Sequence, residues 1–261
     1  MSDDREVGPP APRWSRARWG SAPRRVLMRV TLGRRLWWRR SKNSEVEFWA
    51  GWLTGAPGTE QWASDRESRL EPEVEIREPL VRAELERNPA EEISILDVGA
   101  GPLTSLGYRY PGKRLTIVPT DPLADEYDRL LREARLDPPI RTIRVAGEDL
   151  VEQFGPGRFD IACAVNSLDH SADPLTIIFE MAAVVRDDGG IVLLRHKRNE
   201  GEQARYGGLH QWNFDVAGDS LIVWNIAGAI DVGAALEGRA ETTAWISDGE
   251  AIARLVVRRR V

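Results

Sequence analysis

The sequence has a single cysteine and no long apolar run. Cys163 alone cannot form an internal disulfide or a cysteine-clustered zinc site, and it lies inside an apolar segment, so we expect a buried structural thiol. No segment approaches the roughly 18 consecutive apolar residues that a membrane helix needs. The first residues are acidic and rich in proline, without the apolar core of a secretory signal. We therefore expect a cytoplasmic protein.

Charge is distributed unevenly along the chain. Residues 1–42 carry twelve Arg or Lys and three acidic residues, a net charge of +9 against −5 for the whole chain, which leaves −14 for the remainder. Residues 1–23 are typical of a disordered arm, and residues 24–40 could form a basic amphipathic helix. Such a segment could bind nucleic acid or an anionic membrane surface, or fold as a lid over the acidic remainder. The acidic remainder is a poor nucleic-acid surface by itself, and the sequence gives no firm evidence for a nucleic-acid or a membrane partner.

Three segments are predicted. Residues 1–43 form the basic, partly disordered extension. Residues 44–92 form helices that cover the site; Ser44 and Glu47 have the spacing of a capping box for a helix over residues 44–54, and residues 78–87 form a second helix. Residues 93–261 form the main domain.

Predicted strands and helices alternate from residue 93, which indicates a parallel sheet in an α/β fold. The expected strands span residues 93–97, 115–120, 141–145, 159–166 and 191–195. Helices are expected after the glycine turn at residues 99–101 and over residues 124–134 and 174–185. Three further strands, over residues 221–226, 242–246 and 253–259, have short connections and therefore predict antiparallel pairing at the end of the sheet.

The first predicted strand ends in an acid and a glycine turn, Asp97-x-Gly99-x-Gly101. Glycines let the backbone approach a ligand closely because they carry no Cβ. Asp121, at the end of the next strand, could accept two hydrogen bonds from a ribose diol. These features predict a site for a cofactor that contains a nucleoside, although the glycines could also form only a tight turn and Asp121 only a helix N-cap.

The residues around the turn disfavour a dinucleotide. The dinucleotide fingerprint needs Gly or Ala at its sixth position, which is Thr104 here, and Pro102 lacks an N–H for a phosphate. The carboxylate of Asp97 would repel a pyrophosphate and attract an ammonium or sulfonium group. A nicotinamide-dependent dehydrogenase is therefore the weaker alternative.

Motifs around four of the predicted strands together resemble the class I S-adenosylmethionine-dependent methyltransferases. They are Asp97-x-Gly99-x-Gly101, Asp121, Gly147-Glu148-Asp149, Phe159-Asp160, Asn166-Ser167-Leu168-Asp169-His170 and Asp173-Pro174. The match covers about residues 93–195 and departs from the family at Leu103, where many members have a third glycine. The resemblance implies a three-layer Rossmann-like sandwich with a mostly parallel seven-stranded sheet and an antiparallel last strand. It also assigns residues 93–261 to an S-adenosylmethionine-binding domain.

The resemblance implies a role for each matching residue. Asp97, Gly99 and Gly101 would line the methionine end of S-adenosyl-L-methionine, and Asp121 would bind the ribose hydroxyls. Glu148 or Asp149 would lie near the adenine, and Asn166 would lie under the sulfonium. The predicted cofactor site also includes four neighbours of these residues: Ala100, Pro122, Gly147 and Ser167.

The three histidines, His170, His196 and His210, lie after the fourth and fifth predicted strands, on the side of the sheet where ligands bind. Histidine is suited to remove a proton from a hydroxyl near neutral pH, so all three are candidate catalytic bases. Candidate substrate contacts are Glu200, Glu202 and Tyr206. We predict no metal, because Asp169 and Asp173 alone supply too few carboxylates.

These observations favour a methyltransferase that acts on a small molecule, most simply on a hydroxyl of a natural product or a sugar. The Pro-Pro-aromatic motif of enzymes that methylate nucleobase amines is absent after the fourth strand. Two alternatives stay open. The basic arm could recruit an RNA, peptide or membrane-bound substrate, or the protein could be a non-catalytic cofactor-binding module of the same fold.

Overall fold

The computed structural model describes residues 42–258, and the predicted arm and basic helix before residue 42 lie outside this range. Its main sheet has seven strands in the order β3-β2-β1-β4-β5-β10-β9. Their bounds are β1 (Glu92–Val98), β2 (Arg114–Asp121), β3 (Ile143–Arg144), β4 (Ile161–Val165), β5 (Ile191–Lys197), β9 (Ala240–Ser247) and β10 (Glu250–Val257). β1 to β5 pair in parallel, and β10 is antiparallel to both neighbours. The predicted Rossmann-like sheet with a reversed last strand is confirmed.

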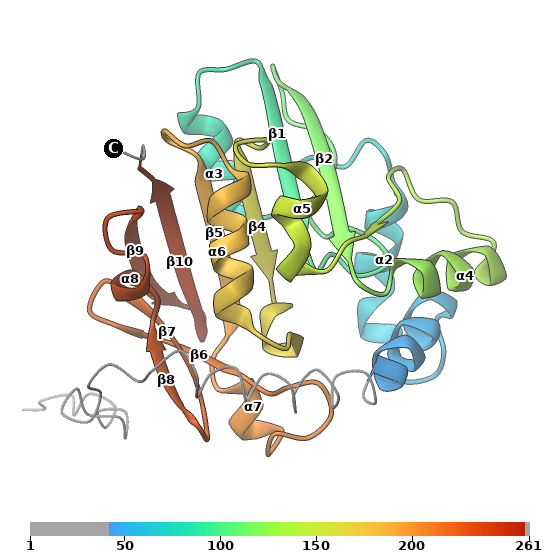
Figure 1. Ribbon diagram of the computed structural model, residues 1–261. Coiled ribbons are helices and arrows are strands. Elements are labelled where there is room, and N and C mark those ends of the chain that lie inside the picture. Colours follow the sequence, from blue (N-terminus) through green and yellow to red (C-terminus); the bar gives the residue numbers. More distant parts are fainter. Residues whose placement is uncertain (1–41, 259–261) are drawn as a thin grey trace, which may run out of the picture.

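Helices cover both faces of this sheet (Figure 1). On one face lie α5 (Leu150–Phe154) and α6 (Pro174–Val184), and on the other lies α3 (Pro79–Arg87). Consecutive strand residues alternate between the two cores: Leu96 packs with α6, whereas Ile95 packs with α3. Both faces of the strands are therefore apolar, as expected for a buried parallel sheet.

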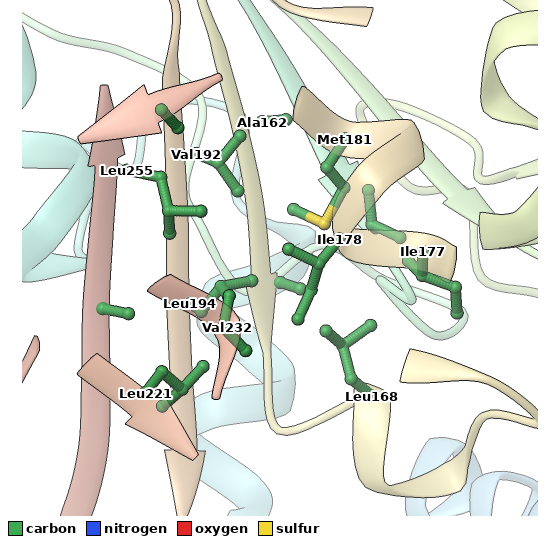
Figure 2. Close-up of a cluster of buried hydrophobic side chains, with 14 of the residues drawn as sticks. Ala162, Leu168, Ile177, Ile178, Met181, Val192, Leu194, Leu221, Val232 and Leu255 are labelled. Carbon is green, nitrogen blue, oxygen red and sulfur yellow. The ribbon is translucent and has the colours of Figure 1, made fainter. Parts of the chain in front are cut away.

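The larger core lies between α6 and the sheet (Figure 2). Ile178 and Met181 of α6 are fully buried against Ala162 of β4 and Leu194 of β5. Cys163, the neighbour of Ala162, is buried on the opposite face, and its burial raises the pKa of the thiol, in agreement with a structural role.

A second, three-stranded antiparallel sheet lies between β5 and β9 in the chain. Its strands are β6 (Asn213–Ala217), β7 (Ser220–Asn225) and β8 (Gly228–Asp231), flanked by α7 (Glu200–Gln203) and α8 (Val232–Ala235). Leu221 and Val223 of β7 join the larger core. The predicted strand over residues 221–226 is therefore correct, but the prediction that it continues the main sheet is wrong.

The helix predicted after the glycine turn is absent. Residues 102–113 form turns and bends whose polar groups are bonded to distant residues. Arg69 donates to the Leu103 carbonyl at 3.0 Å, and the N–H of Arg77 donates to the Leu106 carbonyl at 2.7 Å. Gly107, at φ +90°, lies against the backbone of Glu75, where a Cβ would overlap the carbonyl oxygen. These contacts use the groups that a helix would have to pair internally.

Three helices lie near the end of the sheet where β2 and β4 finish (Figure 1). They are a first described helix over residues 42–54, α2 (Ala63–Leu70) and α4 (Ala124–Ala134). The first described helix packs on α4 through Trp52 and Tyr127, and Lys42 pairs with Glu126 at 3.0 Å. Because the chain is already helical at Lys42, Ser44 lies inside the helix, and the predicted capping box is wrong. Within the described part of the chain, no helix is both long and apolar enough to cross a membrane.

Candidate functional site

A cavity of about 850 Å³ lies at the carboxyl ends of β1, β2, β4 and β5. This volume is in the range of small-molecule sites. Every residue predicted to bind the cofactor lines it: Asp97, Gly99, Ala100, Gly101, Asp121, Pro122, Gly147, Glu148, Asp149, Asn166 and Ser167. His170 and His210 also line it, whereas His196 does not. The fold thus brings the predicted cofactor residues and two of the three histidines to one cavity.

The glycine turn packs tightly on its surroundings. Gly99 and Gly101 have φ values of +73° and +67°, which L side chains rarely adopt. A Cβ on Gly99 would lie 2.5 Å from the Cβ of Ser167, and one on Gly101 would lie 2.9 Å from the Trp49 ring. Both positions therefore require glycine for backbone conformation and for space.

The N–H groups of the turn are already bonded within the protein. Those of Gly99 and Ala100 donate to the Thr120 carbonyl at 2.8 and 3.0 Å, and that of Gly101 donates to Asp121 Oδ2 at 3.2 Å. Pro102 has no N–H. The turn therefore offers no ring of free N–H donors of the kind that binds a pyrophosphate.

Asp121 is a buried carboxylate at the end of β2, with 8% of its surface exposed. Besides Gly101, the N–H of Leu123 donates to its Oδ1 at 2.9 Å, so each oxygen keeps a second lone pair for a ligand hydroxyl. Burial raises its pKa to about 7. The N-cap of α4 is Leu123, so the alternative that Asp121 is only that cap is wrong.

Asp97 is the second buried carboxylate of the cavity, 3% exposed at the end of β1. The hydroxyl of Thr104 donates to its Oδ2 at 2.6 Å. Burial raises the pKa of Asp97 to about 6, although the Thr104 hydrogen bond favours the ionised form. The role of Thr104 was missed in the sequence, where this residue served only as evidence against a dinucleotide.

The turn after β4 completes this side of the cavity. Asn166 has φ +48°, an uncommon conformation for a residue other than glycine, and its Oδ1 accepts from the Lys197 N–H at 2.8 Å. Ser167 donates to the Val98 carbonyl at 2.9 Å, which ties the ends of β4 and β1 together. The hydrogen bonds hold the predicted sulfonium side of the site in a fixed conformation.

The predicted adenine side comes from a short 3-10 helix, η3 (Gly147–Asp149). Gly147 lies against Ile177 of α6, where a Cβ would be 2.8 Å from the Ile177 Cγ2. Glu148 and Asp149 follow and line the cavity. Close packing of Gly147 therefore sets where these two acids stand.

The first described helix contributes residues that sequence analysis did not assign to the site. Glu45, Phe48 and Trp49 line the cavity. The Trp49 Nε1–H donates to Glu45 Oε1 at 2.7 Å, and Glu45 Oε2 lies 3.5 Å from His170 Nδ1. The aromatic residues of this segment indicated that it packs on the main domain. The pairing of Glu45 with His170, 125 positions away, could not be predicted from the sequence.

Asp169, His170 and His210 form a polar cluster at the wall of the cavity, which His170 and His210 line; we call it the Asp-His-His cluster. Asp169 and His170 belong to the 3-10 helix η4 (Leu168–His170), and His210 precedes β6. The Gln211 N–H donates to the Asp169 carbonyl at 3.0 Å and so holds the His210 loop beside η4. His210 Nδ1 lies 2.6 Å from Asp169 Oδ2 and 3.1 Å from His170 Nε2.

Electrostatics couples these groups. The hydrogen bond that His210 donates to Asp169 raises the pKa of His210 and outweighs the opposing effect of burial. Burial alone would raise the pKa of Asp169, but the neighbouring His170 and His210 lower it below its usual value. Asp169 is therefore ionised at neutral pH, although only 2% of its side chain is exposed.

His196 is not a residue of the cavity, and its prediction as a base is corrected. It is 1% exposed in β5 and its ring stacks on Phe214, with centroids 4.1 Å apart. Burial lowers its pKa to about 4, so the ring is neutral near neutral pH. Of the candidate substrate contacts, Glu200 lines the cavity, whereas Glu202 and Tyr206 do not.

No protein-family model matches the chain, and no curated protein does either. Solved structures similar to it include the CurJ carbon methyltransferase, with 13% identity and a TM-score of 0.49 over 80% of this chain and 61% of that chain. A SAM-dependent methyltransferase from Methanosarcina mazei has 15% identity and a TM-score of 0.43 over 72% and 100% of the two chains. The (4+2)-cyclase SpnF has 14% identity and a TM-score of 0.44 over 73% and 85%. The present chain thus spans about 61% of the CurJ chain, and these likenesses are of fold.

Proposed function

We propose that the protein is an S-adenosylmethionine-dependent methyltransferase that methylates a hydroxyl of a small molecule. One observation carries the proposal: a single cavity joins a glycine turn flanked by two buried carboxylates to a pair of imidazoles. The first part suits a positively charged nucleoside cofactor, and the second suits an acceptor that must lose a proton.

The choice of cofactor rests on charge and on the state of the turn. The two buried carboxylates of Asp97 and Asp121 would repel a pyrophosphate. In addition, the N–H groups that could bind it, those of Gly99, Ala100 and Gly101, are bonded within the protein. A sulfonium and an ammonium group are attracted by the same carboxylates. The oxygens of Asp121 can accept from the two ribose hydroxyls. These features support S-adenosylmethionine over a nicotinamide dinucleotide.

The acceptor side supports transfer to oxygen. A 2.6 Å hydrogen bond between His210 and an ionised Asp169 places the proton on Nδ1 and leaves the lone pair on Nε2. In the proposed reaction, the acceptor oxygen bonds to the methyl carbon while the carbon–sulfur bond breaks and its electron pair passes to sulfur. His210 Nε2 takes the hydroxyl proton, and Asp169 stabilises the resulting imidazolium.

The shape of the cavity supports a small acceptor. The first described helix covers the site with Phe48 and Trp49, and Lys42 ties that helix to α4. A natural product or a sugar fits a cavity of about 850 Å³ better than a folded polymer does. Phe48 and Trp49 give one wall of the cavity an aromatic surface suited to a flat or ring-shaped acceptor.

The first experiment is calorimetric titration of S-adenosylhomocysteine into the purified full chain, with NAD as the control. We expect micromolar binding of S-adenosylhomocysteine and no heat from NAD. Tighter binding of NAD, or no binding of S-adenosylhomocysteine, would refute the cofactor assignment. Methyl transfer from labelled S-adenosylmethionine to a panel of hydroxylated small molecules then tests the acceptor class, with His210→Gln as the variant expected to lose the transfer but keep the cofactor.

A further inference from the structure

In place of the expectation from the sequence that no metal binds, we propose that the Asp-His-His cluster is a binding site for one divalent transition-metal ion. Two imidazole nitrogens and one carboxylate oxygen converge there, His170 Nε2, His210 Nδ1 and Asp169 Oδ2. Two histidines and one carboxylate with open positions are a donor set that binds first-row divalent ions. Among the described residues, this is the one group of three such side chains close enough to share an ion.

The distances between the three atoms suit a common ion. His170 Nε2 lies 3.1 Å from His210 Nδ1 and 3.3 Å from Asp169 Oδ2. An ion about 2.0–2.2 Å from each ligand separates neighbouring ligand atoms by roughly 2.8–3.5 Å. The third distance, 2.6 Å between Asp169 Oδ2 and His210 Nδ1, needs only a small opening. His170 and His210 also line the cavity, so an ion between them would lie at its wall.

A second observation points independently to a missing ligand. Asp169 Oδ1 is buried and has no hydrogen-bond partner within the part of the chain that the structure describes, although the residue is only 2% exposed. Leaving a buried charged oxygen unpaired is costly. A cation bound at this carboxylate would offset the cost of burying Oδ1 without a hydrogen bond.

The surroundings also suit a metal. Metal-binding histidines usually donate their second ring N–H to a carboxylate, which fixes the ring. Glu45 Oε2 stands 3.5 Å from His170 Nδ1, the nitrogen that faces away from the cluster, and Glu45 is itself held by Trp49. η4 and the bond between the Gln211 N–H and the Asp169 carbonyl hold the ligands in place from both sides. The imidazole pair favours Mn²⁺, Fe²⁺, Co²⁺ or Zn²⁺ over Mg²⁺ or Ca²⁺, which prefer oxygen ligands.

The role of the ion in methyl transfer rests on the proposed function. An ion at this place would bind the acceptor oxygen and acidify its hydroxyl, so that the proton passes to solvent as the oxygen attacks the methyl group. It would also replace the Nδ1 proton of His210. Deprotonation by the ion and deprotonation by His210 are therefore alternatives, and binding of the ion can be tested without any acceptor.

The test is calorimetric titration of Mn²⁺ and Zn²⁺ into the full chain, prepared without a histidine tag and treated with a chelator. We expect one equivalent to bind to the wild type. Affinity should fall at least 100-fold in Asp169→Asn and His210→Gln. The matched control is Asp173→Asn, which removes a carboxylate four residues from Asp169 but keeps a side chain that can cap α6; it should bind like the wild type.

Absence of stoichiometric binding by the wild type would overturn the proposal, as would equal affinity in the wild type and His210→Gln. His210 is 38% exposed at its side chain, so this variant should fold even if Asp169→Asn does not. The Mn²⁺ electron paramagnetic resonance spectrum gives a second readout, because bound and free ions differ. Metal binding without methyl transfer to any acceptor would refute the proposed function and leave the metal site intact.

Discussion

Asp121 offers a test of whether burial, and not only chemistry, defines the cofactor site. Burial raises its pKa from 3.8 to about 7 in the folded protein. A carboxyl with a higher pKa in the folded than in the unfolded state binds more protons when folded, so stability that is present at low pH is lost as pH rises through about 7. Three pKa units correspond to at most roughly 4 kcal/mol.

The variant Asp121→Asn removes this titration. Between pH 5 and pH 8, we expect the free energy of unfolding of the wild type to fall by about 2–3 kcal/mol relative to the variant. The NH₂ group of the new amide cannot accept one of the hydrogen bonds, which costs the variant about 1 kcal/mol at both pH values. The result is therefore the change of the free energy of unfolding with pH, not the difference between the two proteins at one pH. Urea unfolding of the ligand-free full chain is the assay, because urea does not screen charges.

A matched control is Asp125→Asn, four residues along at the start of α4, where the side chain is 67% exposed. Its stability should follow the wild type at both pH values within about 0.5 kcal/mol. If the free energy of unfolding of Asp121→Asn also changes with pH as that of the wild type does, burial does not raise the pKa of this carboxyl, and the reasoning fails. At pH 8 the same variant should bind S-adenosylhomocysteine at least tenfold more weakly, a loss of about 1.4 kcal/mol; unchanged affinity would remove Asp121 from the ribose site.

Three further substitutions, with Gly112→Ala as a control for the first, test packing and burial in the fold. Gly99→Ala and Gly112→Ala both place a side chain at positive φ, which costs about 1–2 kcal/mol of stability each. Only Gly99 has a close neighbour, so Gly99→Ala should lose roughly 1–3 kcal/mol more than Gly112→Ala. Equal losses of the free energy of unfolding in urea would contradict this. Arg254→Ala should destabilise the protein by roughly 2 kcal/mol, because buried Glu84 loses two bonds at 2.7 and 2.9 Å and keeps the one from the more exposed Arg87, and a loss below about 1 kcal/mol would contradict the expectation. His196→Leu should keep methyl transfer, and a large loss of activity would restore His196 as a catalytic candidate. Between pH 7 and pH 5, the free energy of unfolding should fall by about 2 kcal/mol less in this variant than in the wild type. The reason is that the wild-type ring, whose pKa is lowered to about 4 by folding, opposes folding once the pH falls below its pKa in the unfolded chain, near 6.5.

Local pattern was enough to predict where the proposed cofactor residues lie. β1 and β2 are apolar runs that end in Asp97 and Asp121, and both acids lie at the same edge because parallel strands end together. α4 spans residues 124–134 as predicted. Each of these features depends on residues within about ten positions of one another, so the sequence order itself carries the information.

The features that were not predicted depend on contacts between distant segments. The expected helix after Gly101 is lost because Arg69 and Arg77 bond to the carbonyls that it would need. The pairing of Glu45 with His170 joins residues that no local pattern connects. His196 is different: it lies two positions after Leu194 and on the same face of β5, so the alternation of the strand already indicated burial.

The second sheet has a consequence for how the molecule could change over time. Residues 198–239, between β5 and β9, carry His210 and the β6-β7-β8 sheet, whereas the residues proposed to bind the cofactor all come before β5 in the chain. β5 pairs directly with β10, so the main sheet closes without a strand from that segment. An exchange of this segment would therefore leave the strand order of the main sheet unchanged, but the new segment would have to refill the part of the larger core that Leu221 and Val223 supply.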